Sequence, residues 1–235
     1  MQSNISKNKK KILFIAAHPD DEILGAGGTI AHFIKQKHQV YVIYMSEGVS
    51  ARYSNLKNKK FKKETIEREI MAKKASSVLN FKIIKFFRLK NMRMKYEVLM
   101  NISKKIQKYI EKIEPDEIFT HHSSDLNPDH KTTFDAVFTA CRPSNSFFVK
   151  KICLFEIPSS TDWSSNTINR FHPNLFIDIE NYIGLKNKAL KCYDKELRLP
   201  PHPRSLKNLE ALSVFRGGAV NLKYAEAFQI IRSVK

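Results

Sequence analysis

Cysteine is scarce in this sequence: the 235 residues include only three, widely spaced and without a CxxC pair. A disulfide framework and a thiolate zinc site are therefore not indicated, and we expect the cysteines to be reduced and packed. Residues 1–10 contain no apolar segment, and the hydrophobic run that follows is too short to span a membrane. We expect a flexible segment over residues 1–10 and a cytoplasmic protein without a membrane span.

Three common motifs are missing as well. The glycines at positions 25, 27 and 28 lack the GxGxxG spacing and follow a group of carboxylates, which would repel a dinucleotide pyrophosphate. There is no Walker lysine pattern and no GxSxG nucleophile elbow. These absences argue against a dinucleotide-binding protein, a P-loop enzyme and a serine hydrolase of the nucleophile-elbow type.

What the chain does contain is an alternation of apolar, strand-like runs with helix-like segments. This alternation predicts an α/β, Rossmann-like three-layer fold with a mostly parallel sheet and helices on both faces. No internal repeat or linker divides residues 1–235, and 42% hydrophobic content suffices for one domain. We predict strands at residues 12–17, 39–45, 83–87, 117–120, 151–157 and 175–179. We predict helices at residues 22–37, 63–79 (with Ile66, Ile70 and Val78 on one side), 96–113, 129–141, 182–197, 206–215 and 222–234.

A dense polar cluster follows the first apolar run. His18, Asp20, Asp21 and Glu22 lie between the predicted strand at residues 12–17 and the next helix. Ligands bind at such strand-to-helix turns in open α/β sheets. An imidazole and a carboxylate are ligands that zinc accepts, and a further carboxylate remains for proton transfer.

A second polar cluster follows the predicted strand at residues 117–120 and spans residues 121–130. Two protein ligands are too few for a catalytic zinc site, so a third is expected at another strand end such as this one. Any one of these polar residues alone is most simply explained as a helix cap or a loop contact, but two such clusters favour a joint site. For Asp129, stabilisation of a helix start and orientation of His130 are both expected.

The pattern AHPDDE at residues 17–22, followed by HxxxDxNxDH at residues 121–130, resembles the LmbE/PIG-L family of zinc-dependent de-N-acetylases. The resemblance implies that His18, Asp21 and His130 bind Zn²⁺, or another divalent metal such as Fe²⁺. It also implies that Asp20 is the general base and Glu22 a supporting residue.

The resemblance continues through residues 46–52, 202–205 and 224–228, and so covers nearly the whole chain. It implies substrate-binding roles, towards sugar or phosphate, for four residues in the first two of these segments: Glu47, Arg52, His202 and Arg204. A simpler interpretation of His202 and Arg204 is a proline-flanked surface turn.

One departure concerns Asn127, which stands where well-studied family members have a histidine thought to stabilise the oxyanion and protonate the leaving amine. An asparagine can donate a hydrogen bond to an oxyanion, but it is no general acid near neutral pH. Either His121 or His122 supplies the acid, or Asp20 returns the proton that it takes from water. We favour the return of the proton by Asp20.

The resemblance implies a hydrolase that removes the acetyl group from an N-acetylated amino sugar, a small GlcNAc-type conjugate. The sequence leaves a phosphate group on that substrate and a homo-oligomeric assembly open. The first alternative is a metal- or sugar-binding protein of the same fold without turnover. The second is a nucleic-acid-binding protein, suggested by the net charge of +18, but the lysine clusters do not interleave aromatic residues in a nucleic-acid-binding pattern. We therefore expect no nucleic-acid partner.

Overall fold

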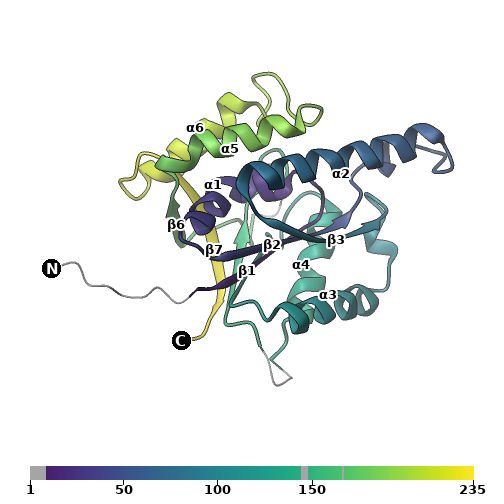
Figure 1. The fold of residues 1–235 in the computed structure, drawn as a ribbon, viewed down its shortest axis with the longest axis horizontal. Coiled ribbons are helices and arrows are strands. Elements are labelled where there is room, and N and C mark those ends of the chain that lie inside the picture. Colours follow the sequence, from purple (N-terminus) through teal and green to yellow (C-terminus); the bar gives the residue numbers. More distant parts are fainter. Residues whose placement is uncertain (1–8, 144–147, 166) are drawn as a thin grey trace.

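The computed structural model describes residues 9–143, 148–165 and 167–235. The predicted flexibility of residues 1–10 falls mostly on residues 1–8, which lie outside these ranges. Within the described ranges, seven strands form one sheet in the order β3-β2-β1-β4-β5-β7-β6 (Figure 1). The strands are β1 (Lys11–Ala16), β2 (Gln39–Ser46), β3 (Lys82–Leu89), β4 (Glu117–His121), β5 (Lys151–Phe155), β6 (Leu175–Asp178) and β7 (Ala225–Ser233).

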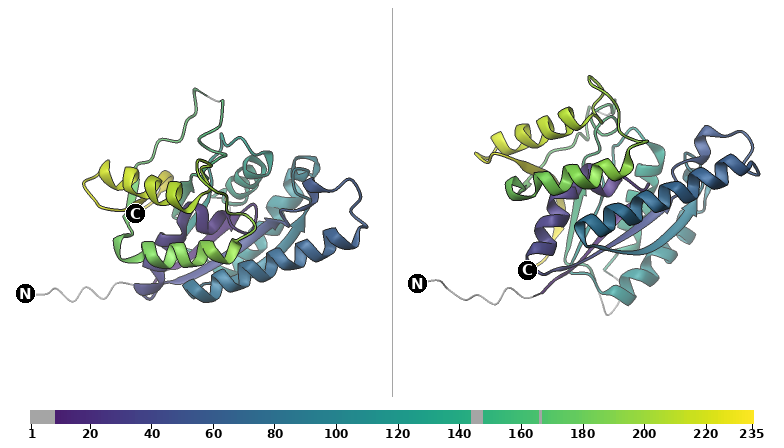
Figure 2. Two further views of the ribbon diagram at one scale, coloured as in Figure 1. Left: turned by 90° about the horizontal axis from the view of Figure 1, so that it is seen from above. Right: turned by 45° about the horizontal axis from the view of Figure 1, so that its top comes forward.

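Strands β1 to β5 pair in parallel, and β7 pairs antiparallel with both β5 and β6. Helices α1, α2, α5 and α6 cover one face of the sheet, and α3 and α4 cover the other (Figures 1 and 2). The predicted three-layer α/β fold with a mostly parallel sheet is confirmed. The helices are α1 (Asp21–Lys35), α2 (Lys59–Leu79), α3 (Leu99–Ile113), α4 (Pro128–Ala140), α5 (Ile183–Leu190) and α6 (Leu206–Gly218). No helix within the described ranges combines the length and apolarity that a bilayer crossing requires.

The centre of the sheet is a topological switch point. From β1 the chain passes outwards to β2 and β3, then returns to β4 on the other side of β1. Each of the residues of β4, and all but the first of β1, is buried, because helices cover both faces. Ligands in open α/β sheets bind where the carboxyl ends of such strands diverge. The residues after β1 and after β4 are therefore brought to one crevice.

The predicted helix at residues 222–234 is wrong, because this segment forms β7. Phe228 and Ile230 pack into the hydrophobic core on one side of the sheet, whereas Ile231 packs into the core on the other side. Side chains that point to opposite faces in this way require a strand. A short apolar run does not distinguish helix from strand by spacing, and its pairing with β5 is a long-range contact.

Helix α2 exposes a different side from the predicted one. Ile66 and Ile70, which were expected to share an apolar side with Val78, are 56% and 44% exposed. The buried side instead carries residues at intervals of three and four, which is the spacing of one helical face. These residues are Arg68, Ala72, Ala75 and Leu79.

The remaining elements lie close to their predicted positions, with shifted ends. The predicted helix at residues 182–197 ends earlier, since α5 stops at Leu190 and a 3-10 turn follows over Lys191–Tyr193. The predicted helix at residues 96–113 starts later, because Met94–Tyr96 forms a 3-10 turn and α3 begins at Leu99. These differences concern one or two turns at the helix ends, whose boundaries are weakly determined by sequence.

Phe228 provides a test of the corrected assignment of β7. Its side chain is fully buried and lies edge-on to Phe119 with ring centroids 5.0 Å apart. We expect Phe228→Ala to lower the free energy of unfolding by about 3–5 kcal/mol, because it leaves a cavity in the core. Urea denaturation followed by circular dichroism measures this loss. Phe215→Ala is the control, since Phe215 is exposed on α6, and should change stability by no more than about 0.5 kcal/mol.

Candidate functional site

The turn between β1 and α1 holds Asp20 in a strained conformation. Its φ of 127° lies in a region that residues other than glycine rarely adopt. The carbonyl of Asp20 accepts hydrogen bonds from the N–H groups of Ile23 and Leu24 at 3.0 and 2.9 Å. Its own N–H donates to Glu22 Oε2 at 3.1 Å, and Glu22 Oε1 accepts from the Tyr193 hydroxyl at 2.7 Å. Glu22 therefore supports the turn, and Tyr193 is a partner that the sequence did not indicate.

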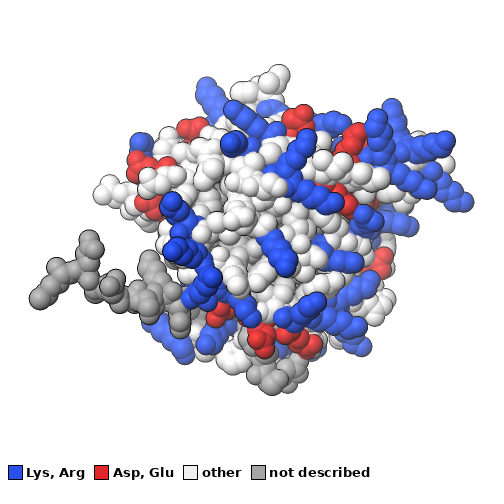
Figure 3. All heavy atoms as spheres, in the orientation of Figure 1, with Lys and Arg blue, Asp and Glu red and all other residues white. Residues whose placement is uncertain are grey.

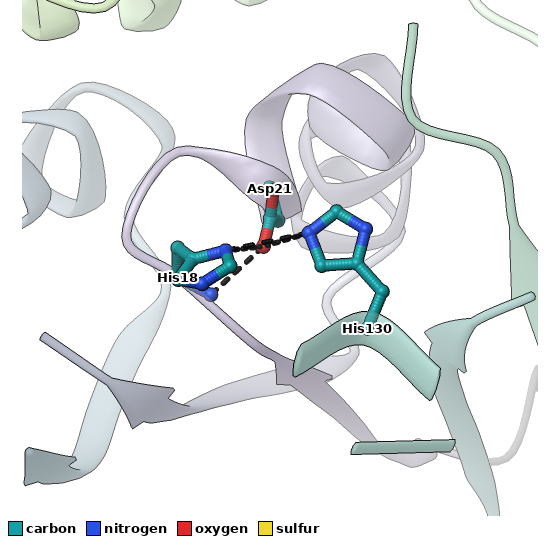
Figure 4. A group of neighbouring side chains, drawn as sticks. All are labelled: His18, Asp21 and His130. Atoms are coloured by element: carbon teal, nitrogen blue, oxygen red, sulfur yellow. Dashed lines mark hydrogen bonds and ion pairs between the residues drawn. The ribbon is translucent and has the colours of Figure 1, made fainter. Parts of the chain in front are cut away.

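Three donor atoms from the two predicted clusters converge beside this turn (Figure 4). His18 Nδ1 lies 3.2 Å from Asp21 Oδ2, and His130 Nε2 lies 3.4 Å from Asp21 Oδ2 and 3.3 Å from His18 Nδ1. All three side chains are buried. Zinc ligands at about 2.0–2.1 Å in a tetrahedral arrangement lie roughly 3.3 Å from one another. The set of two imidazoles and one carboxylate thus fits a divalent metal with one coordination position left open.

Each imidazole of this group has a carboxylate at its other ring nitrogen. His18 Nε2 lies 3.0 Å from Asp129 Oδ2, and His130 Nδ1 lies 3.1 Å from Asp125 Oδ1. Such carboxylates fix the orientation of metal-binding histidines. The expectation that Asp129 orients His130 is therefore wrong, because Asp129 contacts His18 and Asp125 takes that role. Asp129 does lie in the first turn of α4, as predicted.

The charges of the group balance one another within the protein interior. Burial would lower the pKa of His130, but the carboxylates of Asp21 and Asp125 outweigh it and raise this pKa to about 10. Burial would raise the pKa of Asp21, but His130 and His121 hold it well below its usual range. A proton and a metal ion compete for His130 Nε2, so metal binding at neutral pH must release this proton.

The Asp20 carboxylate is buried beside the group, and its Oδ1 atom has no hydrogen-bond partner among the described residues. Its Oδ2 atom lies 3.0 Å from Arg68 Nη2 and 3.6 Å from Arg204 Nη1. Burial raises the pKa of Asp20, and the Asp21 carboxylate adds to this, whereas Arg68 and Arg204 lower it. The net shift is upwards, which makes the Asp20 carboxylate a stronger base.

Arg68 is a site residue that the sequence analysis missed. Its Nε atom donates to the carbonyl of Pro19 at 3.0 Å, and its Nη1 atom donates to the carbonyl of Gly48 at 2.7 Å. It therefore joins the turns after β1 and β2 while it contacts Asp20. The available signal was its position on the buried face of α2, in phase with Ala72 and Ala75. A charged residue on such a face calls for a buried partner.

The predicted substrate-binding residues differ in their distance from this centre. Arg204 reaches Asp20, and its Nε atom donates to Ser159 Oγ at 2.9 Å. Arg52 lines a cavity of about 270 Å³ together with Arg68, and it pairs with Glu196 at 2.9 Å. Arg68 Nη1 also lies 3.1 Å from Glu196, another residue that the sequence did not indicate.

The other two predicted substrate-binding residues are engaged within the protein. The Glu47 carboxylate accepts hydrogen bonds from the N–H groups of Ser50 and Asn91 at 3.2 Å, which organises the loop after β2. His202 Nδ1 accepts from the N–H of Arg204 at 3.0 Å. The His202 ring lies edge-on to the ring of Trp163, with centroids 5.8 Å apart. Trp163 belongs to the loop that follows β5.

The two candidate histidine acids lie in different surroundings. His121 is fully buried, stacks on His130 at 4.0 Å and accepts the N–H of Ala17 at Nε2. Burial, reinforced by the charge of His130, lowers the pKa of His121 to about 4, so it is neutral. His122 lines a separate cavity of about 260 Å³ with Phe171.

Asn127 caps helix α4. Its Oδ1 atom accepts the N–H of Asp129 at 2.8 Å, and its half-buried side chain lies between the buried residues Asp125 and Asp129. The amide oxygen is thus used in the cap, and the NH₂ group is the part that can donate to an oxyanion.

The fold and the site together define a class: three-layer α/β proteins with a His/Asp group at the switch point of the sheet. A family model described as PIG-L, GlcNAc-PI de-N-acetylase, matches residues 13–141, which is more than half of the chain. The chain therefore belongs to the PIG-L family of de-N-acetylases, as its sequence motifs indicated.

Two curated proteins resemble most of the chain. A protein from Escherichia coli K12, described as the uncharacterized deacetylase YaiS, is 28% identical over 189 residues, which cover 79% of this chain and 92% of that protein. A protein from Bacillus anthracis, described as a probable N-acetyl-alpha-D-glucosaminyl L-malate deacetylase 2, is 25% identical over 80% of this chain and 81% of its own length.

Solved structures share the fold. The N,N'-diacetylchitobiose deacetylase of Pyrococcus horikoshii superimposes with a TM-score of 0.75 at 22% identity, covering 98% of this chain and 86% of that one. The 4-carboxy-2-hydroxymuconate hydratase GalB of Pseudomonas putida KT2440 also superimposes with a TM-score of 0.75, at 20% identity over 96% of this chain and 98% of that one. Because one of these proteins is described as a hydratase, the fold alone does not decide the reaction.

His130 and the Asp125 carboxylate that contacts it provide a test of the metal site. We expect His130→Ala to lose bound metal, and Asp125→Asn to weaken metal affinity by about 10–100-fold because it releases the ring of His130. Elemental analysis and a competition titration with a chelator measure these effects. Asp194→Asn is the control, since Asp194 is exposed. Full zinc content in His130→Ala under a mild chelator would contradict the assignment.

Proposed function

We propose that this chain hydrolyses the acetamide of an N-acetylated amino sugar, a GlcNAc-type conjugate, and releases acetate and a free amine. The observation that carries the proposal is the position of Asp20: a strained, buried carboxylate with an unpaired oxygen beside three converging donor atoms. Strain of this kind persists where the surrounding structure enforces it, and it is concentrated at functional sites.

The residues that would hold a divalent metal are His18, Asp21 and His130. A divalent metal supplies two things to amide hydrolysis when it is bound: a lowered pKa for a water molecule and polarisation of a carbonyl oxygen. The donor atoms are oxygen and nitrogen, which zinc accepts and which Fe²⁺ also accepts. The donor set therefore suits either ion.

Asp20 is the group that accepts the proton of the attacking water in this proposal. Its raised pKa makes the carboxylate a stronger base, and Arg68 holds its Oδ2 atom so that the unpaired Oδ1 atom can take the proton. Asp20 then returns the same proton to the departing amine. The neutral, enclosed imidazole of His121 supports this return route, because it is a poor source of a proton at neutral pH.

In the proposed reaction, the side-chain amide of Asn127 stabilises the oxyanion. In support of this, Asn127 precedes the helix that carries His130, and its backbone N–H donates to Asp125, the carboxylate that contacts His130. A hydrogen-bond donor aimed at a developing oxyanion stabilises the transition state more than the substrate.

The substrate class rests on the family and on the names of its relatives, which describe deacetylation of GlcNAc-type conjugates. Arg52 and Arg68 line the cavity next to Asp20 together with three lysines and three glutamates, and five basic groups against three acidic ones leave this lining with an excess of positive charge. An acidic group on the aglycone, such as a phosphate, suits this lining.

The alternative is a metal- or sugar-binding protein without turnover, which Asn127 in place of a histidine supports. Acetate release from a panel of N-acetylated sugars, including nucleotide-linked and lipid-linked forms, separates the two. Release from at least one conjugate supports the enzyme, and binding without release from any conjugate supports the alternative.

Asp20→Asn tests the base within that assay. The amide keeps the shape of the side chain but cannot accept a proton, so we expect a rate lower by about 10²–10⁴-fold with metal content retained. Asp194→Asn is again the control and should keep the wild-type rate. If Asp20→Asn is within a few-fold of the wild type, Asp20 has only a structural role.

Substitution of Arg68 should shift the pH dependence of the reaction. Because its charge lowers the pKa of Asp20, Arg68→Gln raises that pKa. Asp20 must be ionised to act as a base, so activity is lost as the pH falls through its pKa, and the acid limb of kcat/KM should move to higher pH in the variant. An acid limb that stays in place would show that Asp20 is not the group that titrates.

A further inference from the structure

The edge of the sheet formed by β3 carries an unusual combination of exposed apolar and basic side chains. β3 is a terminal strand of the sheet, and the segment that follows it runs over the surface to α3. We call the surface made by this segment, residues 90–100, and the neighbouring cavity under the start of α2 the β3-edge surface.

Apolar exposure is concentrated in the segment after β3. Five of its side chains are between 40% and 76% exposed, and four of them belong to the unbroken exposed run at residues 95–100. Soluble proteins rarely expose large contiguous apolar patches without a binding function. These five residues are Met92, Tyr96, Val98, Leu99 and Met100.

The cavity adds a recess to this patch. It has a volume of about 510 Å³, and its apolar lining comes from Leu56, Phe61 and the exposed Ile66. Lys90 also lines it, and Glu47 in its wall accepts the N–H of Asn91. The cavity and the segment are therefore continuous.

Positive charge surrounds both parts. Residues 57–63 contain five lysines and no acidic residue, and residues 90–105 contain five basic residues against Glu97 alone. Lys90, Arg93 and Lys95 form no ion pair with any residue in the described ranges. In Figure 3, many Lys and Arg side chains lie on the right of the view, around the start of α2.

We propose that the β3-edge surface docks the protein on an anionic lipid bilayer. The apolar side chains enter the boundary between headgroups and acyl chains, and the lysines and arginines contact acidic headgroups. A second copy of this chain is a poor occupant, because it would bring the same positive charge to the contact. Binding of single-stranded nucleic acid would not account for the exposed aliphatic side chains of Val98, Leu99 and Met100, because such binding sites stack bases on aromatic side chains.

The β3-edge surface adjoins the candidate site. The N–H groups of Met92 and Met94 donate to the Asp129 carboxylate at 2.7 and 3.4 Å, and Asp129 contacts His18. A docked bilayer therefore lies beside the site, although docking itself does not depend on the proposed reaction.

Vesicle flotation with the full chain tests the proposal. We expect the protein to float with vesicles of phosphatidylcholine and phosphatidylglycerol, to stay below vesicles of phosphatidylcholine alone, and to be released by salt. The combined substitutions Tyr96→Ser, Val98→Ser and Met100→Ser should weaken the partition into anionic vesicles by about tenfold or more. A matched control replaces three other exposed apolar residues, Leu199→Ser, Val214→Ser and Phe215→Ser, and should float like the wild type.

Circular dichroism and urea denaturation establish that each variant is folded. Should the serine variant be unstable, Lys90→Gln, Arg93→Gln and Lys95→Gln together test the same surface through its charge and should also reduce flotation. Flotation of folded edge variants at the wild-type level would overturn the proposal, as would a wild type that floats with neither vesicle. A dimer in sedimentation velocity that the serine variant dissociates would overturn it too, by assigning the surface to a second copy.

Discussion

The parallel pairing of β1 with β4 is the constraint on which the site depends. These two strands lie side by side at the switch point of the sheet, so the residues after each are held in one crevice although they lie more than 100 positions apart in the chain. His18 and Asp21 lie in the turn after β1 and at the start of α1, and His130 lies in the first turn of α4. Rigid elements fix all three donor atoms, which keeps the separations between them near those of a tetrahedral site.

The same crevice holds several buried carboxylates that have positively charged or imidazole groups as neighbours. Asp21 and Asp125 face imidazoles, whereas Asp20 faces the guanidinium groups of Arg68 and Arg204. Burial raises the pKa of Asp20 in spite of these guanidinium groups, whereas His130 and His121 outweigh burial at Asp21 and hold its pKa well below the usual range. Two carboxylates with opposite shifts suit different roles, one as a ligand and one as a base.

Much of this arrangement could be predicted from sequence because its signals are local. The apolar run before His18 and the helix after Asp20 locate the first cluster, and the proline at position 128 locates the start of α4. Arg68 escaped prediction because its partners lie on other elements, and only its phase on α2 distinguishes it from a surface arginine. β7 was assigned to a helix for a related reason, since its pairing partner β5 lies about 70 residues earlier.

Asn127 illustrates how a residue beside the candidate site can serve the fold. Asparagine is among the most favourable N-cap residues, and here its oxygen satisfies the N–H of Asp129 at the start of α4. That helix start carries His130, and Asp129 itself holds His18. The cap therefore stabilises the geometry of two of the three donor residues at once. An imidazole at this position would offer a group that can act as an acid, whereas the asparagine strengthens the start of the helix that carries His130.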